Sequence, residues 1–316
     1  MKKVLPLVFI ALILLVISFI GSWHSFYKSS SVQFQPTKVD STLSVRMDQD
    51  SSGFENARSL PIPEYLEFAG EPVPLNDPDV WERLDRELHI NVYWHTNTIL
   101  MIKRANRWLS IIAEELKKDS IPDDFKYIVA IETNFQNDTS PRGAVGFWQF
   151  VNDAAKEKGL EITNEVDERY DPIKATRAAA DYLKHAHEKF GSWSLAAASY
   201  NRGITGMMKA MEHQKENDYY ALLLNEETSR YVFRILAAKL VLETPEKYGY
   251  IISPEHLYKP FETYSVEVTQ TIPNLVDWAQ EHAITYRQLK RYNPWLQSDQ
   301  LTVGSGKTYS IQISNK

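Results

Sequence analysis

The chain has 316 residues, of which 43% are hydrophobic and 24% charged, so it can bury the cores of about two domains. Its formal net charge of -6 supplies no basic surface for a polyanion, which argues against nucleic-acid binding. It has no cysteine, and this excludes disulfides, thiolate metal sites, a cysteine nucleophile and a lipid-modified cysteine.

Residues 1–22 predict a membrane anchor or an export signal. Lys2 and Lys3 precede an uninterrupted apolar run, Val4 to Ile20, which is just long enough to span the hydrocarbon core of a bilayer. A cleaved signal peptide has a similar pattern, but no A-x-A cleavage site follows, which favours an uncleaved anchor. The lysines would then stay in the cytoplasm. We expect a cell-envelope protein that is anchored in the cytoplasmic membrane with its remainder in the periplasm, or an exported protein if the segment is cleaved.

Residues 23–78 predict an extracytoplasmic linker. The segment is rich in Ser, Gln, Asp and Pro, and Pro61, Pro63, Pro72 and Pro74 punctuate its later half. This composition is typical of a tether with extended stretches. We expect ordered structure to begin near Asp79.

Residues 79–250 predict a mainly helical domain. Apolar residues recur at helical spacing from Trp81 and again from Ile99 to Leu116. A proline at position 122 with two aspartates after it suits a helix start, and Asp171 and Pro172 begin another helix that Gly191 ends. Further helices are expected at residues 193–200, 204–212 and 226–243.

Residues 262–316 have a different pattern and predict a small α+β module. Residues 264–268 and 309–313 alternate between apolar and polar side chains as short strands do. Two helical patterns, near residues 275–282 and 286–292, lie between them. The expected order is strand, helix, helix, strand.

Glu132 is the strongest candidate for a catalytic group. Phe125, Ile128 and Val129 lie seven, four and three residues before it, so in a helix Glu132 projects from the apolar face. Burial there raises the pKa of a carboxyl, because it penalises the charged form. A protonated carboxyl is what general-acid catalysis needs. The alternative is a glutamate at a helix end that reaches solvent or pairs with an arginine.

Three further segments carry polar and aromatic side chains. Residues 140–150 read Ser-Pro-Arg-Gly-Ala-Val-Gly-Phe-Trp-Gln-Phe, in which two glycines permit close backbone approach and the aromatic pair with glutamine suits a sugar. Residues 198–203 read Ala-Ser-Tyr-Asn-Arg-Gly at a helix end, and residues 227–232 read Glu-Thr-Ser-Arg-Tyr-Val at a helix start. Each segment alone is also compatible with ordinary packing.

Together and in this order, these segments resemble the catalytic domain of the soluble lytic transglycosylase (SLT) family, most closely its membrane-bound D-type branch. The likeness covers residues 110–250. Glu132 and Thr133 stand where the family has its catalytic Glu-Ser, residues 140–149 match Ser-Pro-x-Gly-Ala-x-Gly-x-x-Gln, and residues 198–203 match Ala-x-Tyr-Asn-x-Gly. Thr133 departs from the usual serine but keeps a hydroxyl. The resemblance implies a lysozyme-like helical fold.

The resemblance also implies a peptidoglycan lytic transglycosylase. Such an enzyme cleaves the β-1,4 bond between N-acetylmuramic acid and N-acetylglucosamine and leaves 1,6-anhydromuramic acid ends, in cell-wall turnover or remodelling. Glu132 would serve as both acid and base, without a metal or other cofactor. The substrate-binding residues that the resemblance implies are Ser140, Gln149, Tyr200, Asn201 and Tyr231.

Two other functions stay open. A muramidase with the same fold would hydrolyse the bond with water, and a catalytically silent protein would only bind peptidoglycan. Ordinary glycosidases use a second carboxylate, and the nearest acid in the sequence, Asp138, is interpreted as a loop residue. A silent protein would be expected to lose its acid, whereas Glu132 is present.

The C-terminal module resembles LysM, a small glycan-binding fold, through its strands and the Asn293-Pro294 pair. Its first turn reads Thr-Gln-Thr-Ile at residues 269–272, where the family usually has Gly-Asp-Thr-Leu. All matched catalytic motifs precede residue 250. Removal of residues 262–316 is therefore expected to weaken binding to the cell wall and to leave turnover of soluble glycan fragments largely intact.

The eight histidines form no metal-binding pattern. His185 and His187 lie two apart on a predicted helix and face different directions. The expected partners are the glycan strands of peptidoglycan and the membrane, with no nucleic acid. The sequence identifies no protein partner.

Overall fold

The structure is a computed structural model that describes residues 58–314. The predicted anchor, residues 1–22, and the first part of the predicted linker, residues 23–57, lie outside the described residues. Within residues 58–314, no helix is both long and apolar enough to cross a membrane. The described residues belong to one compact unit, in which a helical domain is followed by a small module.

The linker prediction is wrong for residues 58–77, which fold onto the helical domain. Strands β1 (Glu67–Phe68) and β2 (Glu71–Pro72) form a short antiparallel hairpin. The Phe68 side chain is fully buried, and its ring centroid lies 5.2 Å from that of Phe125. Isolated apolar residues between the prolines anchor the segment, because each finds a place in the domain core. They are Leu60, Leu66, Phe68 and Val73.

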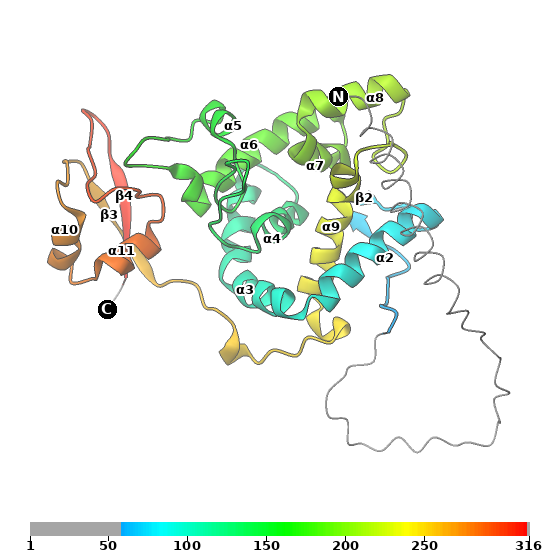
Figure 1. Cartoon of the computed structure of the whole chain (residues 1–316), viewed down its shortest axis with the longest axis horizontal. Coiled ribbons are helices and arrows are strands. Elements are labelled where there is room, and N and C mark those ends of the chain that lie inside the picture. Colours follow the sequence, from blue (N-terminus) through cyan, green and yellow to red (C-terminus); the bar gives the residue numbers. More distant parts are fainter. Residues whose placement is uncertain (1–57, 315–316) are drawn as a thin grey trace, which may run out of the picture. The chain divides into compact units, whose positions relative to one another are not determined.

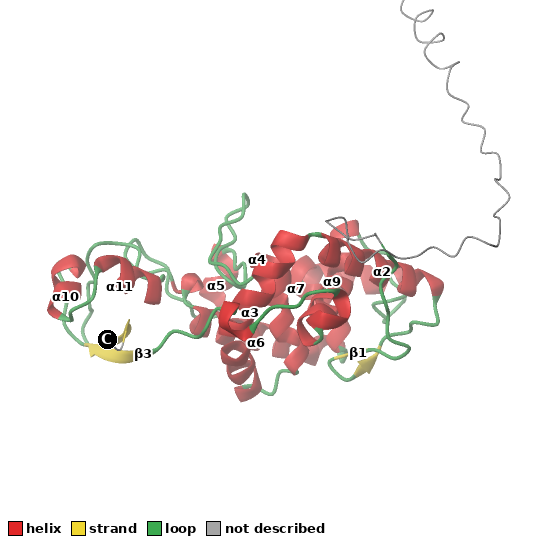
Figure 2. Cartoon of the chain, turned by 90° about the horizontal axis from the view of Figure 1, so that it is seen from below, coloured by secondary structure: helices red, strands yellow, loops and turns green. Residues whose placement is uncertain are grey.

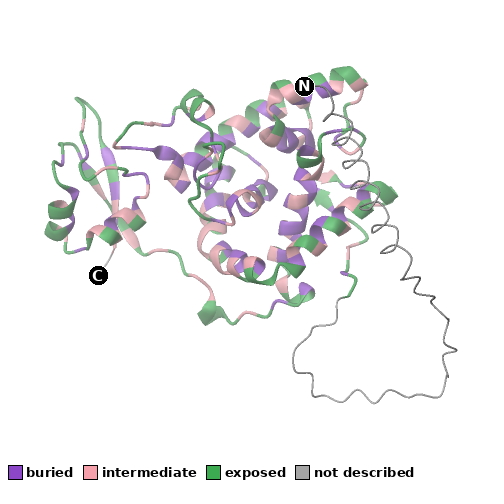
Figure 3. Cartoon of the chain, viewed as in Figure 1, coloured by how far each residue is buried: buried purple, intermediate pink, exposed green. Residues whose placement is uncertain are grey.

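The helical domain confirms the mainly α prediction (Figures 1 and 2). Its α-helices are α2 (Pro78–Tyr93), α3 (His95–Lys118), α4 (Ile128–Thr133), α5 (Asn152–Glu157), α6 (Pro172–Phe190), α7 (Trp193–Arg202), α8 (Ile204–Gln214) and α9 (Glu226–Glu243). Helix α9 packs against α2, α4 and α7 and is buried along much of its length (Figure 3). It therefore joins α2, α4 and α7 in the domain core.

The helix boundaries follow the predicted signals. The Asp171 carboxylate accepts the backbone N–H groups of Ile173 and Lys174 at the start of α6, and Gly191 ends this helix with φ of 66°. The helix predicted from Pro122 begins as a 3-10 helix, Asp123–Tyr127, and continues as α4. A 3-10 turn at a helix start is common.

The C-terminal module has the predicted strand, helix, helix, strand order. Strand β3 (Thr263–Val268) pairs antiparallel with β4 (Tyr309–Ser314), and helices α10 (Leu275–Glu281) and α11 (Tyr286–Tyr292) come between them in the chain. Its core contains the fully buried side chains of Leu275, Ala279, Leu289, Leu301, Ile311 and Ile313.

Candidate active site

Glu132 lies in the last turn of α4 and borders two cavities. One, of about 800 Å³, is lined by residues from α2, α3 and α9, and the other, of about 530 Å³, is lined by residues 140–151 and by α7. The side chains of Glu132 and Glu227 line both cavities. A chain-like ligand could therefore extend to either side of the Glu132 carboxyl.

The backbone turns sharply directly after Glu132. Asn134 and Phe135 both have left-handed conformations, with φ of 54° and 56°. This conformation is tolerated by asparagine and costly for phenylalanine. The Asn134 amide donates to Asn97 Oδ1 (2.7 Å), and the Phe135 side chain is buried. Both contacts hold the turn in place. Strain of this kind is frequent at functional sites.

Tyr231, on α9, contacts the Glu132 carboxyl directly. Its hydroxyl donates to Glu132 Oε1 at 2.6 Å. Burial raises the pKa of Glu132, and the hydrogen bond from Tyr231 and the positive charge of Arg234 lower it only in part. The negative charge of Glu227 raises the pKa further. The site therefore favours the protonated carboxyl, as the apolar helix face predicted.

Tyr231 is itself fully buried, and burial raises the pKa of its hydroxyl well above the ordinary value. It therefore stays a hydrogen-bond donor over the range in which Glu132 titrates. The Thr133 hydroxyl, by contrast, donates to Phe147 O (3.2 Å) and so connects α4 to the loop that follows it.

The pKa of Glu132 provides a direct test of this geometry. We expect carbon-13 NMR titration to give a pKa above the ordinary value for glutamate, because desolvation outweighs the hydrogen bond. Tyr231→Phe removes the donor that favours the charged form and should raise the pKa further. Tyr127→Phe is the matched control, since Tyr127 donates to Glu243 (3.1 Å) elsewhere. A pKa that fell in Tyr231→Phe would contradict the assigned role of this hydroxyl.

The predicted residues Ser140 and Gln149 line the smaller of the two cavities that Glu132 borders. Ser140 Oγ accepts the backbone N–H of Ala144 (3.0 Å). The Gln149 side-chain amide donates to Gly146 O (2.9 Å) and Asp138 O (3.2 Å), and Gln149 has a positive φ of 52°. Both side chains thus shape the loop, which we name the 137–150 loop.

Tyr200 and Asn201 come from the end of α7. The Tyr200 hydroxyl donates to Trp148 O (2.8 Å), and burial raises its pKa well above the ordinary value. Asn201 Nδ2 donates to Glu227 (3.0 Å), and Asn201 Oδ1 accepts the Thr228 hydroxyl (2.8 Å). Asn201 therefore connects α7 to the start of α9.

Sequence reasoning missed Glu227 as an acidic neighbour of Glu132. Only Asp138 was considered, and Asp138 lines the larger cavity. Glu227 lines both cavities, and its charge raises the Glu132 pKa. Its place one turn before Tyr231 on α9 was the signal, because residues four apart share a helix face.

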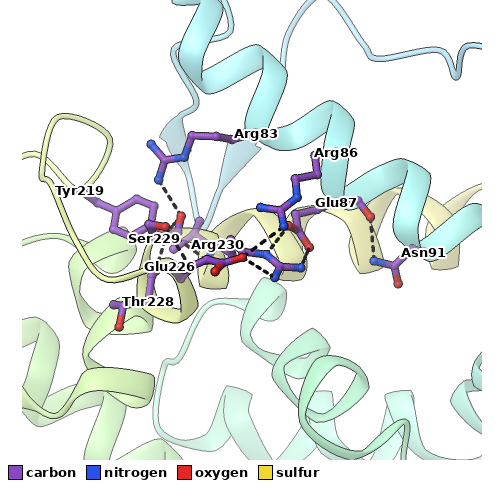
Figure 4. Close-up of polar contacts among 10 residues, drawn as sticks. Arg83, Arg86, Glu87, Asn91, Tyr219, Glu226, Thr228, Ser229 and Arg230 are labelled. Carbon is purple, nitrogen blue, oxygen red and sulfur yellow. Dashed lines mark hydrogen bonds and ion pairs between the residues drawn. The ribbon is translucent and has the colours of Figure 1, made fainter. Parts of the chain in front are cut away.

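A polar network fixes the beginning of α9 against α2 (Figure 4). Arg230 donates to the buried Glu87 carboxylate at 2.6 and 3.2 Å. Arg83 donates to Ser229 O (2.6 Å), which also accepts the Tyr219 hydroxyl (2.7 Å). These bonds fix the start of α9, the helix that carries Glu227 and Tyr231.

No group of three or more potential metal ligands occurs in the part of the chain that the structure describes. The prediction that the chemistry needs no metal remains a prediction.

Two domain families match the sequence. Residues 110–223 match the transglycosylase SLT domain, and residues 264–316 match the soluble lytic transglycosylase C-terminal LysM-like domain. The first match includes the positions of Glu132, Ser140, Gln149, Tyr200 and Asn201. Tyr231 lies beyond it.

Curated relatives and one solved structure are also similar. "Membrane-bound lytic murein transglycosylase D" of Escherichia coli K12 is 25% identical over 258 residues, or 79% of this chain and 55% of that protein. A "Putative tributyltin chloride resistance protein" of Alteromonas sp. is 30% identical over 126 residues, or 39% of this chain and 61% of that protein. An inactive mutant of the lytic transglycosylase Slt from Pseudomonas aeruginosa aligns with a TM-score of 0.36 and 18% identity over 56% of this chain and 33% of that chain.

The chain spans about half the length of the E. coli relative that it matches, with 55% of that protein covered. The domain families that the sequence segments resembled are confirmed by both domain matches. The chain therefore carries a transglycosylase SLT domain followed by a C-terminal LysM-like domain, and it is homologous to membrane-bound lytic murein transglycosylase D.

Proposed function

We propose that this chain is a peptidoglycan lytic transglycosylase with Glu132 as its acid and base. The observation that carries the proposal is a half-buried carboxyl whose pKa is raised by burial, at the junction of two cavities inside an SLT domain. A glycan strand would occupy the cavities on both sides of Glu132. The bond that is cut would be the β-1,4 bond between N-acetylmuramic acid and N-acetylglucosamine.

The hydrogen bond from Tyr231 favours one arrangement of the proton. Tyr231 donates to Glu132 Oε1, so the acidic proton belongs on the other carboxyl oxygen, which can face the glycosidic oxygen. In the first step this proton passes to the leaving oxygen as the C1–O bond breaks. In the second step, the carboxylate takes the proton of the C6 hydroxyl while the C6 oxygen bonds to C1 of the same sugar. This closes the 1,6-anhydro ring.

The Tyr231 hydroxyl stabilises the carboxylate between these two steps, because hydrogen bonds to charged acceptors are the stronger ones. Gln149, Ser140, Tyr200 and Asn201 are proposed to hold the sugars beside Glu132. All four residues line the smaller cavity, which supports this role.

A muramidase is the second candidate, and Glu227 is the observation that favours it. An inverting glycosidase needs a second carboxylate to activate water on the opposite face of the sugar. Glu227 lines both cavities beside Glu132, although the Asn201 amide already occupies one of its oxygens.

The mass of the released muropeptides separates the possibilities. Purified protein is incubated with intact sacculi, and Glu132→Gln serves as the negative control. Products lighter by one water than hydrolysed muropeptides carry the anhydro ring and are the expected result. Hydrolysed products would show a muramidase instead. Binding without any release would show a catalytically silent protein.

We also propose that the chain acts in the cell envelope, anchored in the cytoplasmic membrane by residues 1–22. The lysines and apolar run at the start of the sequence support this location, as does the name of the E. coli relative, which describes that protein as membrane-bound. The catalytic domain is proposed to extend from residue 58 to about 250, because residues 58–77 contribute to its core.

A further inference from the structure

The C-terminal module shares its hydrophobic core with a segment of the SLT domain. Residues 160–170, which connect α5 to α6, form a tight turn in which Thr163 N–H donates to Val166 O (2.7 Å). We name residues 161–168 the docking turn. Val166 is only 1% exposed and belongs to the module core, where it forms an antiparallel bridge with Leu296. The module core is thus completed by a residue from the other domain.

Hydrogen bonds surround this shared core. Two are between backbones, Asp167 N–H to Trp295 O (2.9 Å) and Gln297 N–H to Glu165 O (2.8 Å). The Glu165 carboxylate accepts the Gln300 side chain (2.6 Å) and the Thr302 backbone N–H (2.6 Å), which lower its pKa. The geometry resembles strand addition, in which backbone pairing gives binding and side chains give register.

The Glu161 carboxylate adds a second polar contact with β4 and the turn before it. It accepts the Tyr309 hydroxyl at 3.0 Å and forms an ion pair with Lys307 at 2.5 Å. The docking turn is therefore attached to the module at both of its sides.

Arg169, which directly follows the docking turn, reaches the 137–150 loop. The Asp167 carboxylate holds the Arg169 guanidinium with bonds to Nε (3.0 Å) and Nη2 (2.7 Å), and both side chains are buried. Arg169 Nη1 then donates to Gly143 O and Phe150 O, each at 3.3 Å. Because Asp167 fixes the guanidinium plane, the positions of these two carbonyls depend on the docking turn.

Tyr170 adds two bonds to the first part of the loop. Asn137 Nδ2 donates to Tyr170 O (2.9 Å), and Thr139 Oγ1 lies 3.0 Å from the Tyr170 hydroxyl. Tyr170 is also partly buried against the module core. Contacts with the docking turn and the residues after it therefore span the loop from Asn137 to Phe150.

A second route joins the module to the same loop through aromatic rings. Tyr292 of α11 lies 5.2 Å from Phe261, Phe261 lies 6.0 Å from Trp108 of α3, and Trp108 lies 5.0 Å from Phe147, between ring centroids. The guanidinium groups of Arg107 and Arg291 lie over the Phe261 ring at 4.2 and 4.8 Å. Edge-to-face pairs and cation–π contacts of this kind are stabilising and directional.

We propose that the LysM-like module positions the 137–150 loop for substrate binding, through the docking turn and through Phe261. Val166, Asp167, Arg169 and Phe261 are positioning residues, since none of them lines either cavity beside Glu132. The module is then part of the catalytic unit as well as a glycan-binding candidate. This rests on the proposed function for its kinetic consequence, and it argues against the expectation that residues 262–316 can be removed without loss of turnover.

The test uses the full chain with Val166→Ala and Phe261→Ala combined. Val166→Ala weakens the contact through the docking turn and Phe261→Ala the contact through the aromatic rings, and neither residue lines a cavity beside Glu132. Amide hydrogen exchange is followed at Ser140, Gly146 and Phe150, whose N–H groups bond within the loop. We expect their exchange to speed up at least about tenfold in the double variant. The paired strands β3 and β4 report in the same experiment whether the module stays folded.

Kinetics on soluble glycan fragments supply the second readout. We expect KM to rise about tenfold while kcat changes less, since a misplaced loop weakens sugar contacts and leaves Glu132 in place. The pH dependence of kcat should be unchanged. Arg169→Lys, which keeps the charge and loses the planar fork, should reproduce the KM effect without loss of module folding.

Two controls accompany these variants. Phe261→Tyr as a single substitution keeps the ring and should show wild-type exchange. Asp181→Asn removes a surface ion pair with Lys158 (2.7 Å) that lies outside the loop and the module, and it should also leave loop exchange unchanged. Unchanged loop exchange in the double variant overturns the proposal, whether the module stays folded or not. Because exchange is measured without substrate, failure of the proposed transglycosylase activity would leave this result intact and is recognised separately from the released products.

Discussion

Replacing Glu132 by glutamine is expected to abolish bond cleavage and to preserve the fold. The amide has the size of the carboxyl, and its oxygen can still accept the Tyr231 hydroxyl that lies 2.6 Å from Glu132 Oε1. It cannot give a proton to the leaving oxygen or take one from the C6 hydroxyl. Loss of acid–base catalysis typically costs about 10²- to 10⁴-fold in rate. Release of muropeptides from sacculi measures the effect.

Stability provides a check on the same variant. The pKa of Glu132 is raised in the folded protein, so the folded state loses stability as pH rises above the ordinary glutamate pKa. Glutamine carries no such penalty, and the variant should unfold at the same or a higher urea concentration at neutral pH. Glu243→Gln is the matched control, because Glu243 also accepts a tyrosine hydroxyl, that of Tyr127, at 3.1 Å. Equal activity loss in both variants would remove Glu132 from the acid role.

The second large effect is expected from Gly146→Ala. A Cβ at this position would lie 1.9 Å from Arg169 O and 2.8 Å from Arg169 C, and Gly146 has a positive φ of 78°. Both obstacles are backbone, so the 137–150 loop and residue 169 must move apart. Overpacking and the left-handed conformation together cost about 2 to 5 kcal/mol in unfolding free energy. Urea unfolding followed by fluorescence measures it.

Gly143→Ala separates the two causes of this loss. Gly143 has the same φ of 78°, but nothing lies within 4 Å of its Cβ position. It should therefore lose only the conformational part, about 1 to 2 kcal/mol. If the two alanine variants unfolded at the same urea concentration, close packing of the loop on Arg169 would not explain the glycine at position 146.

The parts of the fold that the sequence predicted are those with strong local signals. Helix α6 has a capping aspartate, a first-turn proline and a terminal glycine, and α9 has a sustained apolar period, so both were placed correctly. Helix α5 was missed because six residues offer too little periodicity. Residues 58–77 were misassigned because single apolar anchors between prolines have no period, and only their distant partners make them part of a core.

The candidate site shows the same division between local and distant information. Glu132 could be selected from the apolar residues on its own helix, and the loop from its glycines. The Tyr231 hydroxyl contacts Glu132 from α9, 99 residues later in the chain. The Glu227 carboxylate, on the same helix, lines the two cavities that Glu132 borders. The resemblance assigned Tyr231 a binding role, whereas its place on the carboxyl depends on how α9 packs against α2 and α4. No spacing rule within one helix contains that information.

The pairing of β3 with β4 has a consequence for the order of folding during synthesis. Strand β3 pairs with β4 from Thr263 opposite Ser314 to Val268 opposite Tyr309. It therefore leaves the ribosome about 45 residues before its partner strand. The helical domain relies mostly on contacts among residues 58–250, which are available earlier. Nascent chains stalled before residue 309 should therefore hold a folded helical domain whose docking turn is still uncovered. Val166 would then be exposed to solvent on the translating chain until the last strand completes the module core.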